Sequence, residues 1–581
     1  MLDPPGVPEL HAEAMQAAKA TADTAFVMSI LRPLARTITQ PISLLVLLAW
    51  FGVMALLVNR SYLQASSNLA TDLARYGSSA TWRGVYYRGE KIGFTVSQTV
   101  PKGDGFDLEE DGRLQMALLG ATTAASIRTT AHVDSNFTLR GFEFSLDPGT
   151  GPIEVIGTIG GDPKTSGNPK RVALHLSVKT ASGTRTEDRV LDEAPALSLN
   201  LSRRLANGGL VAGARHHWTV FDPATLHNAP VTVDVGKREL IAGPGRPIPA
   251  FRVEMEFSGI RTIAWVTDTG DVVREESPLG LITIRETPER ARAMAVPVKV
   301  QTDMYDAAAI VPTGKERIDE PRDVRRLRVR LSGVDLLTSS SRSDLDGASQ
   351  AATPEGAAMI VEIRDARGLK AERTDPAAKQ YLTPEPLIES DDAAIIAEAQ
   401  AAIRGVSDRR AQAEKLTRYV NGLLEKKPTV SIPSAKEVLR TKVGDCNEHT
   451  ALFVAMARAV GLPARIAVGL VFVRGAFYYH AWPEVYIEEG AGRGLWLPVD
   501  PTLNEFPADA THVRLARGGL EKQTAILPLI GRLKMAVLDL DVEPGSRRIL
   551  AGATVPPGAP ADLGPIALPR ASRKTCCACS K

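Results

Sequence analysis

Three residues in the second half of the chain could together carry out covalent acyl transfer. They are Cys446, His480 and Asp500, with 34 residues from the cysteine to the histidine and 20 more to the aspartate. A thiolate nucleophile needs a base close enough to share its proton, and that imidazole needs an acceptor that fixes its tautomer. The spacing fits neighbouring antiparallel strands that present His480 and Asp500 near one level. The pattern therefore predicts a cysteine nucleophile served by an imidazole base.

The residues around Cys446 predict a buried helix that begins close to it. Residues 450–460 are apolar on nearly every side, and a Gly-Leu-Pro sequence at 461–463 ends the helix. The exposed N–H groups and the dipole at a helix start stabilise an anion, so we expect a lowered thiol pKa. An inert buried cysteine would more naturally lie inside the apolar run than among the polar residues 444–448.

The elements around this helix predict helices packed on an antiparallel sheet. Three strands are expected at 466–473, 477–487 and 494–499, with His480 on the second and Asp500 directly after the third. Upstream, capping residues and apolar periodicity predict helices that begin near residues 390–392, 408 and 434. The expected core spans residues 387–533.

Other polar and aromatic residues near these three are further candidates for a functional role. Trp482 and Tyr486 share a strand face with His480, because side chains alternate along a strand. They are candidates for an acyl-binding groove, with simple packing as the alternative. His449 lies one helical turn after Cys446, but no second pair at zinc-like spacing accompanies it. We therefore expect no metal, and since no phosphate-binding glycine loop stands out, no cofactor.

The region before this core predicts mainly β-structure. Residues 81–290 alternate in short runs around Gly-containing turns at 89–90, 182–183 and 269–270, which indicates a large, curved antiparallel sheet. Residues 295–375 are expected to form a smaller β unit. Within it, the Ser, Ala and Gly residues of 338–357 predict a mobile loop.

Both ends of the chain have unusual composition. Residues 42–58 carry no charge and would form a helix of about 26 Å, which is within the range of membrane spans. Arg32 and Arg36 precede them and favour a cytoplasmic N-terminal segment, residues 1–41. A cleaved signal peptide is the alternative, although no cleavage-like site follows directly. Residues 552–581 are rich in Pro, Ala and Gly, which predicts a disordered tail.

Charge and cysteine content exclude two classes of protein. The net charge of the 581 residues is +2, which argues against a dedicated nucleic-acid binder. Three of the four cysteines lie within the last six residues, so the chain is no disulfide scaffold. For that terminal cluster, Cys576, Cys577 and Cys579, three alternatives are open: a metal site, acylation or a reading-frame artefact.

Three sequence blocks resemble a known family. GDCNEHTALFVAMARAVGLPAR, YYHAWPEVY and PVDPTLNEF are similar to the signature blocks of the bacterial transglutaminase-like superfamily, within the papain-like cysteine enzymes. The resemblance implies that Cys446 is the nucleophile, His480 the general base and Asp500 the residue that orients it. Membrane-anchored bacterial members have a similar layout, with a β-rich region ahead of the core.

The overall expectation is an α+β protein: a transmembrane helix, a β-rich region, a small β unit and a papain-like transglutaminase core. It would be a single-pass protein of the bacterial inner membrane with an extracytoplasmic catalytic domain. Acting on a protein or peptide, it would form a thioester on Cys446 and pass the acyl group to water, as a peptidase or amidase, or to an amine, as a transglutaminase. The alternative is a non-catalytic periplasmic binding or scaffolding protein with a relict core. The sequence leaves the oligomeric state open.

Overall fold

The computed structural model describes Tyr76 and residues 79–543, apart from short gaps at 119–120, 150, 162–170, 258, 279, 295–302, 335, 337–341, 430–431, 491, 520–521 and 523–525. The predicted anchor at 42–58, the segment 1–41 and the tail 552–581 lie outside the described residues. Within the described part of the chain, no helix combines the length and the apolar character that crossing a bilayer requires.

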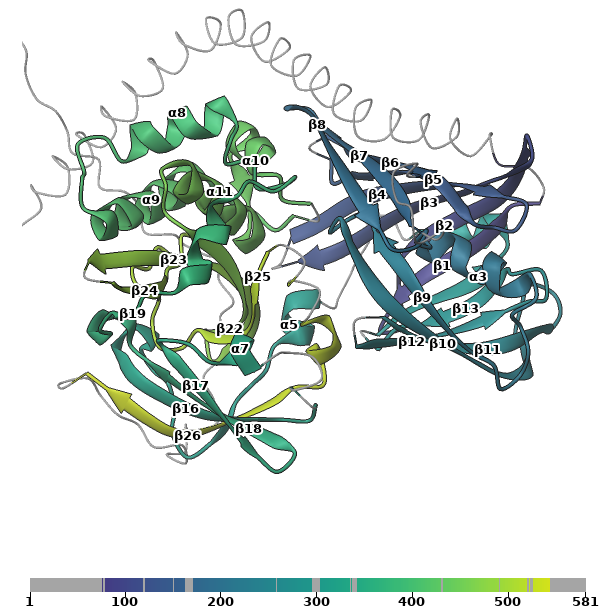
Figure 1. Ribbon diagram of the computed structural model, residues 1–581. Coiled ribbons are helices and arrows are strands. Elements are labelled where there is room, and N and C mark those ends of the chain that lie inside the picture. Colours follow the sequence, from purple (N-terminus) through teal and green to yellow (C-terminus); the bar gives the residue numbers. More distant parts are fainter. Residues whose placement is uncertain are drawn as a thin grey trace, which may run out of the picture. The chain divides into compact units, whose positions relative to one another are not determined.

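The first sheet is antiparallel, has fourteen strands and curves strongly (Figure 1). Consecutive strands are neighbours from β1 to β8 and from β9 to β14, and β1 pairs with β14 to join the two halves. Its strands are β1 (Thr81–Tyr87), β2 (Glu90–Lys102), β3 (Gly105–Leu118), β4 (Ala121–Asp134), β5 (Leu139–Asp147), β6 (Ile153–Gly161), β7 (Val172–Thr180), β8 (Gly183–Leu191), β9 (Arg215–Asp222), β10 (His227–Ile241), β11 (Ile248–Phe257), β12 (Ile260–Val266), β13 (Val272–Glu276) and β14 (Leu281–Glu286). The three predicted hairpins are confirmed as β1–β2, β7–β8 and β12–β13.

One helix, α3 (Ser198–Ala206), connects β8 to β9 and packs on this sheet. Its buried Leu201 and Leu205 join a cluster of aliphatic side chains from β10, β11 and β12. The contact gives the sheet a covered apolar region of its own.

The second sheet has five strands and draws one of them from the far end of the described chain. Its order is β15 (Thr313–Gly314), β26 (Lys534–Val542), β16 (Val324–Ser332), β18 (Ala358–Arg364) and β17 (Gln350–Glu355). The predicted loop at 338–357 is wrong, because α7 (Arg342–Leu345) and β17 lie within it. The buried side chains of β17 include Gln350 and Ala352, whose polar or small character hides the alternation in the sequence.

The third sheet has the order β19 (Glu372–Arg373), β24 (Arg493–Pro498), β23 (Ala476–Gly490), β22 (Ala464–Val473) and β25 (Val513–Gly518). Packed with it are the helices α8 (Ala393–Ala402), α9 (Arg409–Leu423), α10 (Ala435–Thr441) and α11 (Cys446–Ala459) (Figure 1). The predicted strands and helices of this region are confirmed within a few residues.

Helix α11 is the centre of this layer. It packs against the other three helices and also against β22 and β23. Residues from Glu448 to Arg458 are buried all around it, as the unbroken apolar run predicted. Burial on all sides fixes the helix, and therefore its first residue, relative to the sheet.

Candidate active site

Cys446 is the first residue of α11, and the residues around it set the start of that helix. The Asp445 carboxylate accepts a hydrogen bond from the backbone N–H of Asn447 at 3.0 Å. In return, the Glu448 carboxylate accepts one from the N–H of Asp445 at 2.8 Å. These reciprocal bonds form a capping box that satisfies N–H groups at the helix start. The thiol therefore has a defined place at the helix terminus, where it is half-buried.

Two contacts fix this helix start against β23. Thr450 lies one turn after Cys446, and its hydroxyl donates a hydrogen bond to the carbonyl of Ala481 at 3.1 Å. The backbone N–H of Ala481 is in turn hydrogen-bonded to the Cys446 thiol. Because Ala481 is the next residue after His480, these bonds bring the thiol to the strand that carries the imidazole.

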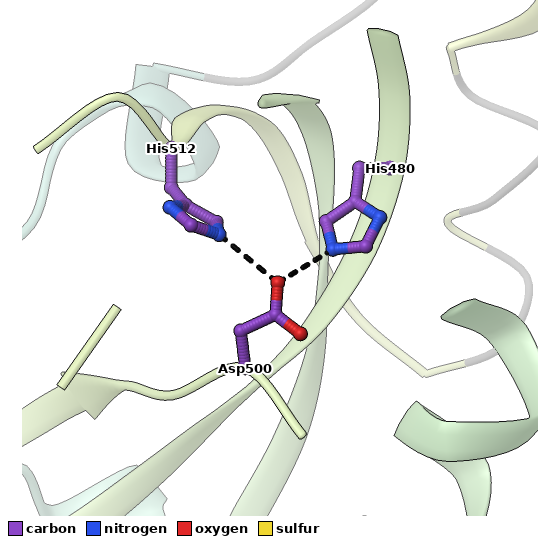
Figure 2. A group of neighbouring side chains, drawn as sticks. All are labelled: His480, Asp500 and His512. Atoms are coloured by element: carbon purple, nitrogen blue, oxygen red, sulfur yellow. Dashed lines mark hydrogen bonds and ion pairs between the residues drawn. The ribbon is translucent and has the colours of Figure 1, made fainter. Parts of the chain in front are cut away.

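His480 and Asp500 come together across the sheet, as predicted. His480 lies on β23, and Asp500 follows directly after β24, the neighbouring strand. The imidazole Nε2 is 2.7 Å from the carboxylate Oδ2 (Figure 2). Asp500 is completely buried and His480 nearly so. The bond to Nε2 leaves Nδ1 as the ring nitrogen available to the thiol.

A second histidine, which the sequence analysis did not identify, holds the same carboxylate. His512 immediately precedes β25, and its Nε2 lies 3.1 Å from Oδ2 of Asp500 (Figure 2). Its Nδ1 lies 3.3 Å from the carboxylate of Asp509. The other carboxylate oxygen of Asp500, Oδ1, accepts backbone N–H bonds from Thr502 at 2.7 Å and Leu503 at 2.9 Å. Asp500 is therefore held from both of its oxygens.

The buried Asp500 and the two histidines bonded to it stabilise each other's charged forms. Burial would raise the pKa of Asp500, but the charges and hydrogen bonds of His480 and His512 outweigh it, so this pKa lies far below its usual range. Burial would lower the pKa of His512, but hydrogen bonds to Asp500 and Asp509 and the charges of Asp509 and Glu505 raise it well above the ordinary value. At neutral pH the group therefore contains an ionised Asp500 and a cationic His512.

The electrostatic environment of the thiol differs from the prediction. Burial raises the pKa of Cys446 well above its ordinary value, and the negative charges of Asp445, Glu448 and Asp500 raise it further. The N–H of Ala481 lowers this pKa, but by less. The expected lowering of the Cys446 pKa by the helix terminus is therefore wrong, because burial and then the carboxyl groups that cap α11 outweigh the helix dipole. The resting thiol is protonated and must give its proton to a base when it reacts.

Tyr305 is another residue near the thiol that the sequence analysis missed. It lies on α5 (Met304–Ala308), and its hydroxyl donates a hydrogen bond to Oδ2 of Asp445 at 3.3 Å. Burial and the charges of Asp445 and Cys446 raise the pKa of this hydroxyl, so it stays a neutral donor. No local sequence signal could have found Tyr305, which precedes Asp445 by 140 residues.

The predicted substrate-binding aromatics are both buried. Trp482 is 1% exposed, and its ring is stacked with that of His480 at 6.1 Å between centroids. The Tyr486 hydroxyl accepts a hydrogen bond from the backbone N–H of Asp375 at 2.9 Å, and its ring packs on Trp496. These are packing contacts that support the strand carrying His480. A part in substrate binding stays a prediction for both residues.

The histidines near the thiol are engaged in hydrogen bonds. His449 is buried, and its Nδ1 lies 2.6 Å from the carbonyl oxygen of Asp445. The ligand atoms of His480, Asp500 and His512 are close enough together to surround a metal ion, as are those of Glu505, Asp509 and His512. His512 belongs to both groups and uses both ring nitrogens in bonds to carboxylates. It therefore offers no lone pair to a metal in this arrangement.

A comparison with known protein families finds a match for the region that contains the candidate site. The family described as the transglutaminase-like superfamily matches residues 397–501. No curated protein matches the sequence.

Solved structures with some similarity include a protein from Cytophaga hutchinsonii that is provisionally assigned as a cysteine protease. It shares 16% identity, with 40% of this chain and 89% of that chain covered and a TM-score of 0.24. A β-barrel-like protein of the family DUF1849 from Brucella abortus shares 12% identity over 36% of this chain and 96% of its own, with a TM-score of 0.26. The periplasmic domain of TgpA from Pseudomonas aeruginosa, bound to ethylmercury, shares 19% identity over 26% of this chain and 56% of its own, with a TM-score of 0.19.

The family match covers the helices α9 to α11, the strands β22 to β24 and the three residues that the sequence analysis selected. His512 and β25 lie beyond its end. Residues 397–501, with Cys446, His480 and Asp500, are a transglutaminase-like domain.

Proposed function

We propose that this domain is a thiol enzyme that cleaves or transfers amide acyl groups through a thioester on Cys446. The observation that carries the proposal is the 2.7 Å bond between His480 and the buried Asp500, next to the Ala481 N–H that is bonded to the thiol. A base oriented by a carboxylate and adjacent to a nucleophile is the arrangement that acyl transfer requires.

The chemistry begins with a neutral thiol. His480 takes the proton from Cys446 as the sulfur attacks the amide carbonyl, and the negative charge moves to the carbonyl oxygen. When the C–N bond breaks, the protonated His480 gives its proton to the leaving amine, and a thioester remains. Water or an amine then attacks the thioester carbonyl and gives its proton to His480. The C–S bond breaks, the acid or amide product leaves, and His480 returns the proton to the Cys446 sulfur.

The negative oxygen of the tetrahedral intermediate needs a donor. The N–H of Cys446 lies in the first turn of α11, where the helix supplies no carbonyl to accept it. We assign this N–H as one oxyanion donor.

Two further parts of the proposal concern the acyl acceptor and the location of the catalytic domain. We favour water as the acceptor, because aminolysis requires a site that excludes bulk water. The uncharged residues 42–58 and the arginines before them support a membrane anchor with the catalytic domain outside the cytoplasm. The substrate would then be a protein or peptide of the cell envelope.

A pair of assays tests the proposal. The full chain is incubated with dimethylcasein, and hydrolysis is measured as new amino termini while transfer is measured as incorporation of monodansylcadaverine. We expect hydrolysis, and we expect Cys446→Ala to abolish it. The variant must have an unchanged circular dichroism spectrum. If Cys446→Ala retained full activity, the enzyme proposal would fail and the scaffolding alternative would replace it.

A further inference from the structure

A pocket of about 330 Å³ lies within the first sheet, between the strands and α3. Its lining residues all lie between Thr81 and Glu275, so the transglutaminase-like domain contributes none of them. This volume is within the range of small-molecule sites. The acyl-transfer chemistry proposed above makes no use of this pocket.

Strand pairing places the polar lining residues on one face of the sheet. Ser97 on β2 is paired with Glu110 on β3, and Arg83 on β1 is paired with Thr95 on β2. Directly paired residues point to the same face, as do residues two positions apart on one strand. These four side chains therefore lie together, and three of them line the pocket: Arg83, Ser97 and Glu110.

Another part of the pocket lining is aliphatic. Leu201 and Leu205 of α3 face Val233, Val253 and Val266 from β10, β11 and β12. All five are buried. The pocket is thus amphiphilic. Its second cation, Arg203, forms an ion pair with Asp271, which also lines the pocket.

Glu275 connects the polar and aliphatic parts of the lining. It lies on β13, paired with Ala264 on β12, and both line the pocket. Arg83, the nearby cation, is already engaged in an ion pair with Glu110 and donates a hydrogen bond to Thr95 at 3.2 Å.

Among the residues that the structure describes, no hydrogen bond or ion pair reaches the Glu275 carboxylate. Burial raises the pKa of Glu275, and the charge of Glu110 raises it further, while the charge of Arg83 opposes them. Glu275 is half-buried. A carboxylate that is partly withdrawn from water without a partner is destabilised, and a cation that hydrogen-bonds to it offsets that cost.

We propose that this pocket binds a small amphiphilic cation, with a protonated amine on Glu275 and an aliphatic part against α3 and β10 to β12. An anionic ligand would find Arg83 already neutralised by Glu110 and would face the Glu275 carboxylate. A neutral ligand would leave that carboxylate without a counter-charge. The aliphatic wall favours a ligand with a hydrocarbon chain over a bare metal ion or a polyamine.

Octylamine is the probe, because its ammonium group is charged at pH 7.5 and its chain is short enough for the pocket. Its binding to the full chain is measured by isothermal titration calorimetry and by the shift in thermal unfolding, with octanoate and octanol as matched ligands. We expect octylamine to raise the unfolding temperature and the other two to leave it unchanged.

Glu275→Gln keeps the shape of the side chain and removes its charge. We expect this variant to bind octylamine at least about tenfold more weakly, which is the usual scale for losing a charged hydrogen bond. The matched control is Glu256→Gln, which changes an exposed glutamate on β11 and should bind as the unaltered chain does. If Glu275→Gln failed to fold, Ala264→Met would test the same pocket, because it fills space beside Glu275 and should also weaken binding.

Three results would overturn the proposal. They are the absence of any octylamine binding, equal binding by the unaltered chain and by the folded test variant, and equal stabilisation by octanol or octanoate. None of these results depends on Cys446, so the pocket and the proposed enzyme activity are tested separately.

Discussion

At the scale of single residues, the nucleophile lies at a helix start that is capped by carboxylates. Asp445 and Glu448 define where α11 begins, and their carboxyl groups also raise the pKa of the Cys446 thiol, which burial raises most. The same residues therefore position the thiol and keep it protonated. In the proposed mechanism, catalysis therefore depends on proton transfer from Cys446 to His480 during the reaction, not on a thiolate formed beforehand.

Burial and the charge of Glu448 raise the pKa of Asp445 well above its usual range. Replacing this carboxyl group should make the Cys446 thiol more acidic. Asp445→Asn keeps a good N-cap residue, because asparagine and aspartate cap about equally well. We expect the apparent pKa of Cys446 to fall, and alkylation by iodoacetamide at pH 7.5 to quicken by about tenfold for each pKa unit. Asp408→Asn at the N-cap of α9 is the matched control. An unchanged pH profile of alkylation would show that Asp445 does not control the thiol.

The second histidine should couple stability to pH. The pKa of His512 is raised in the folded protein, so its contribution to stability is fully present below the unfolded pKa of about 6.5 and is lost as pH rises through the folded pKa. That contribution is about 1.4 kcal/mol for each unit by which the pKa is raised. His512→Gln should therefore lower the free energy of unfolding more at pH 6 than at pH 9. Urea denaturation at the two pH values measures this, and an equal loss at both would contradict it.

The residue that orients the base should matter less than the nucleophile. Asp500→Asn can present an N–H to His480 and favour the wrong tautomer, a change that costs about 10⁴ in kcat in serine triads. Sulfur is the better nucleophile, so we expect a loss of about 10–10³ here. The hydrolysis assay measures kcat, with unchanged circular dichroism as the control. Undiminished activity would remove Asp500 from the mechanism.

The sequence identified residues that lie in local motifs and missed those that only folding brings together. Cys446 begins a helix with a clear signal, His480 lies within a strand with a clear signal, and Asp500 follows closely after another. His512 precedes β25, and its partner Asp500 is twelve residues away across an irregular loop. Tyr305 comes from an element that no periodicity connects to α11.

At the scale of elements, β22 holds the site together from the middle of the sheet. Gly469 on this strand is paired with His480 on β23 and with Arg514 on β25. A methyl group at Gly469 would overlap the carbonyl oxygen of Val513, so the two strands can approach only because this residue has no side chain. The glycine therefore lets His480 and His512 reach one carboxylate.

A side chain at Gly469 should push β25 away from β22 and destabilise the fold. Gly469→Ala is expected to cost about 2–4 kcal/mol, because backbone and not a flexible side chain must move. Displacing β25 also moves His512 away from Asp500, so hydrolysis should fall with stability. Gly422→Ala is the control: this glycine is inside α9 with open space around it, and alanine there should stabilise by about 0.5–1 kcal/mol. Equal stabilities for the two variants would contradict the close-approach argument.

Alternation along the strands explains which elements the sequence could predict. The large sheet and the strands β22 to β24 carry clear apolar or turn signals. β17 carries no such signal. No apolar pattern or residue spacing indicates that β26 pairs with β16, some two hundred residues earlier in the sequence. Long-range pairing depends on the whole fold, which local patterns do not encode.

At the scale of the whole molecule, the transglutaminase-like domain depends on residues outside the predicted core of 387–533. The side chain of Gln350 bonds to the backbone N–H and C=O of Arg514. The backbones of Ile310 and Phe477, near the start of β23, pair as an isolated antiparallel β-bridge. The Asp375 carboxylate accepts a hydrogen bond from the indole N–H of Trp496 at 2.9 Å. The core alone would expose these contacts.

A truncation series tests this dependence. A fragment of residues 387–533 should aggregate, because it exposes the apolar surface that the second sheet and residues 303–382 cover. A fragment of residues 303–543 keeps α5, the second sheet with β26 and the third sheet, so it should be soluble and monomeric by size-exclusion chromatography. Cys446 in this longer fragment should show the same pH profile of alkylation as in the full chain, since Tyr305 and Asp445 are both retained. A soluble, folded 387–533 fragment with that same profile would show that the core positions its nucleophile unaided.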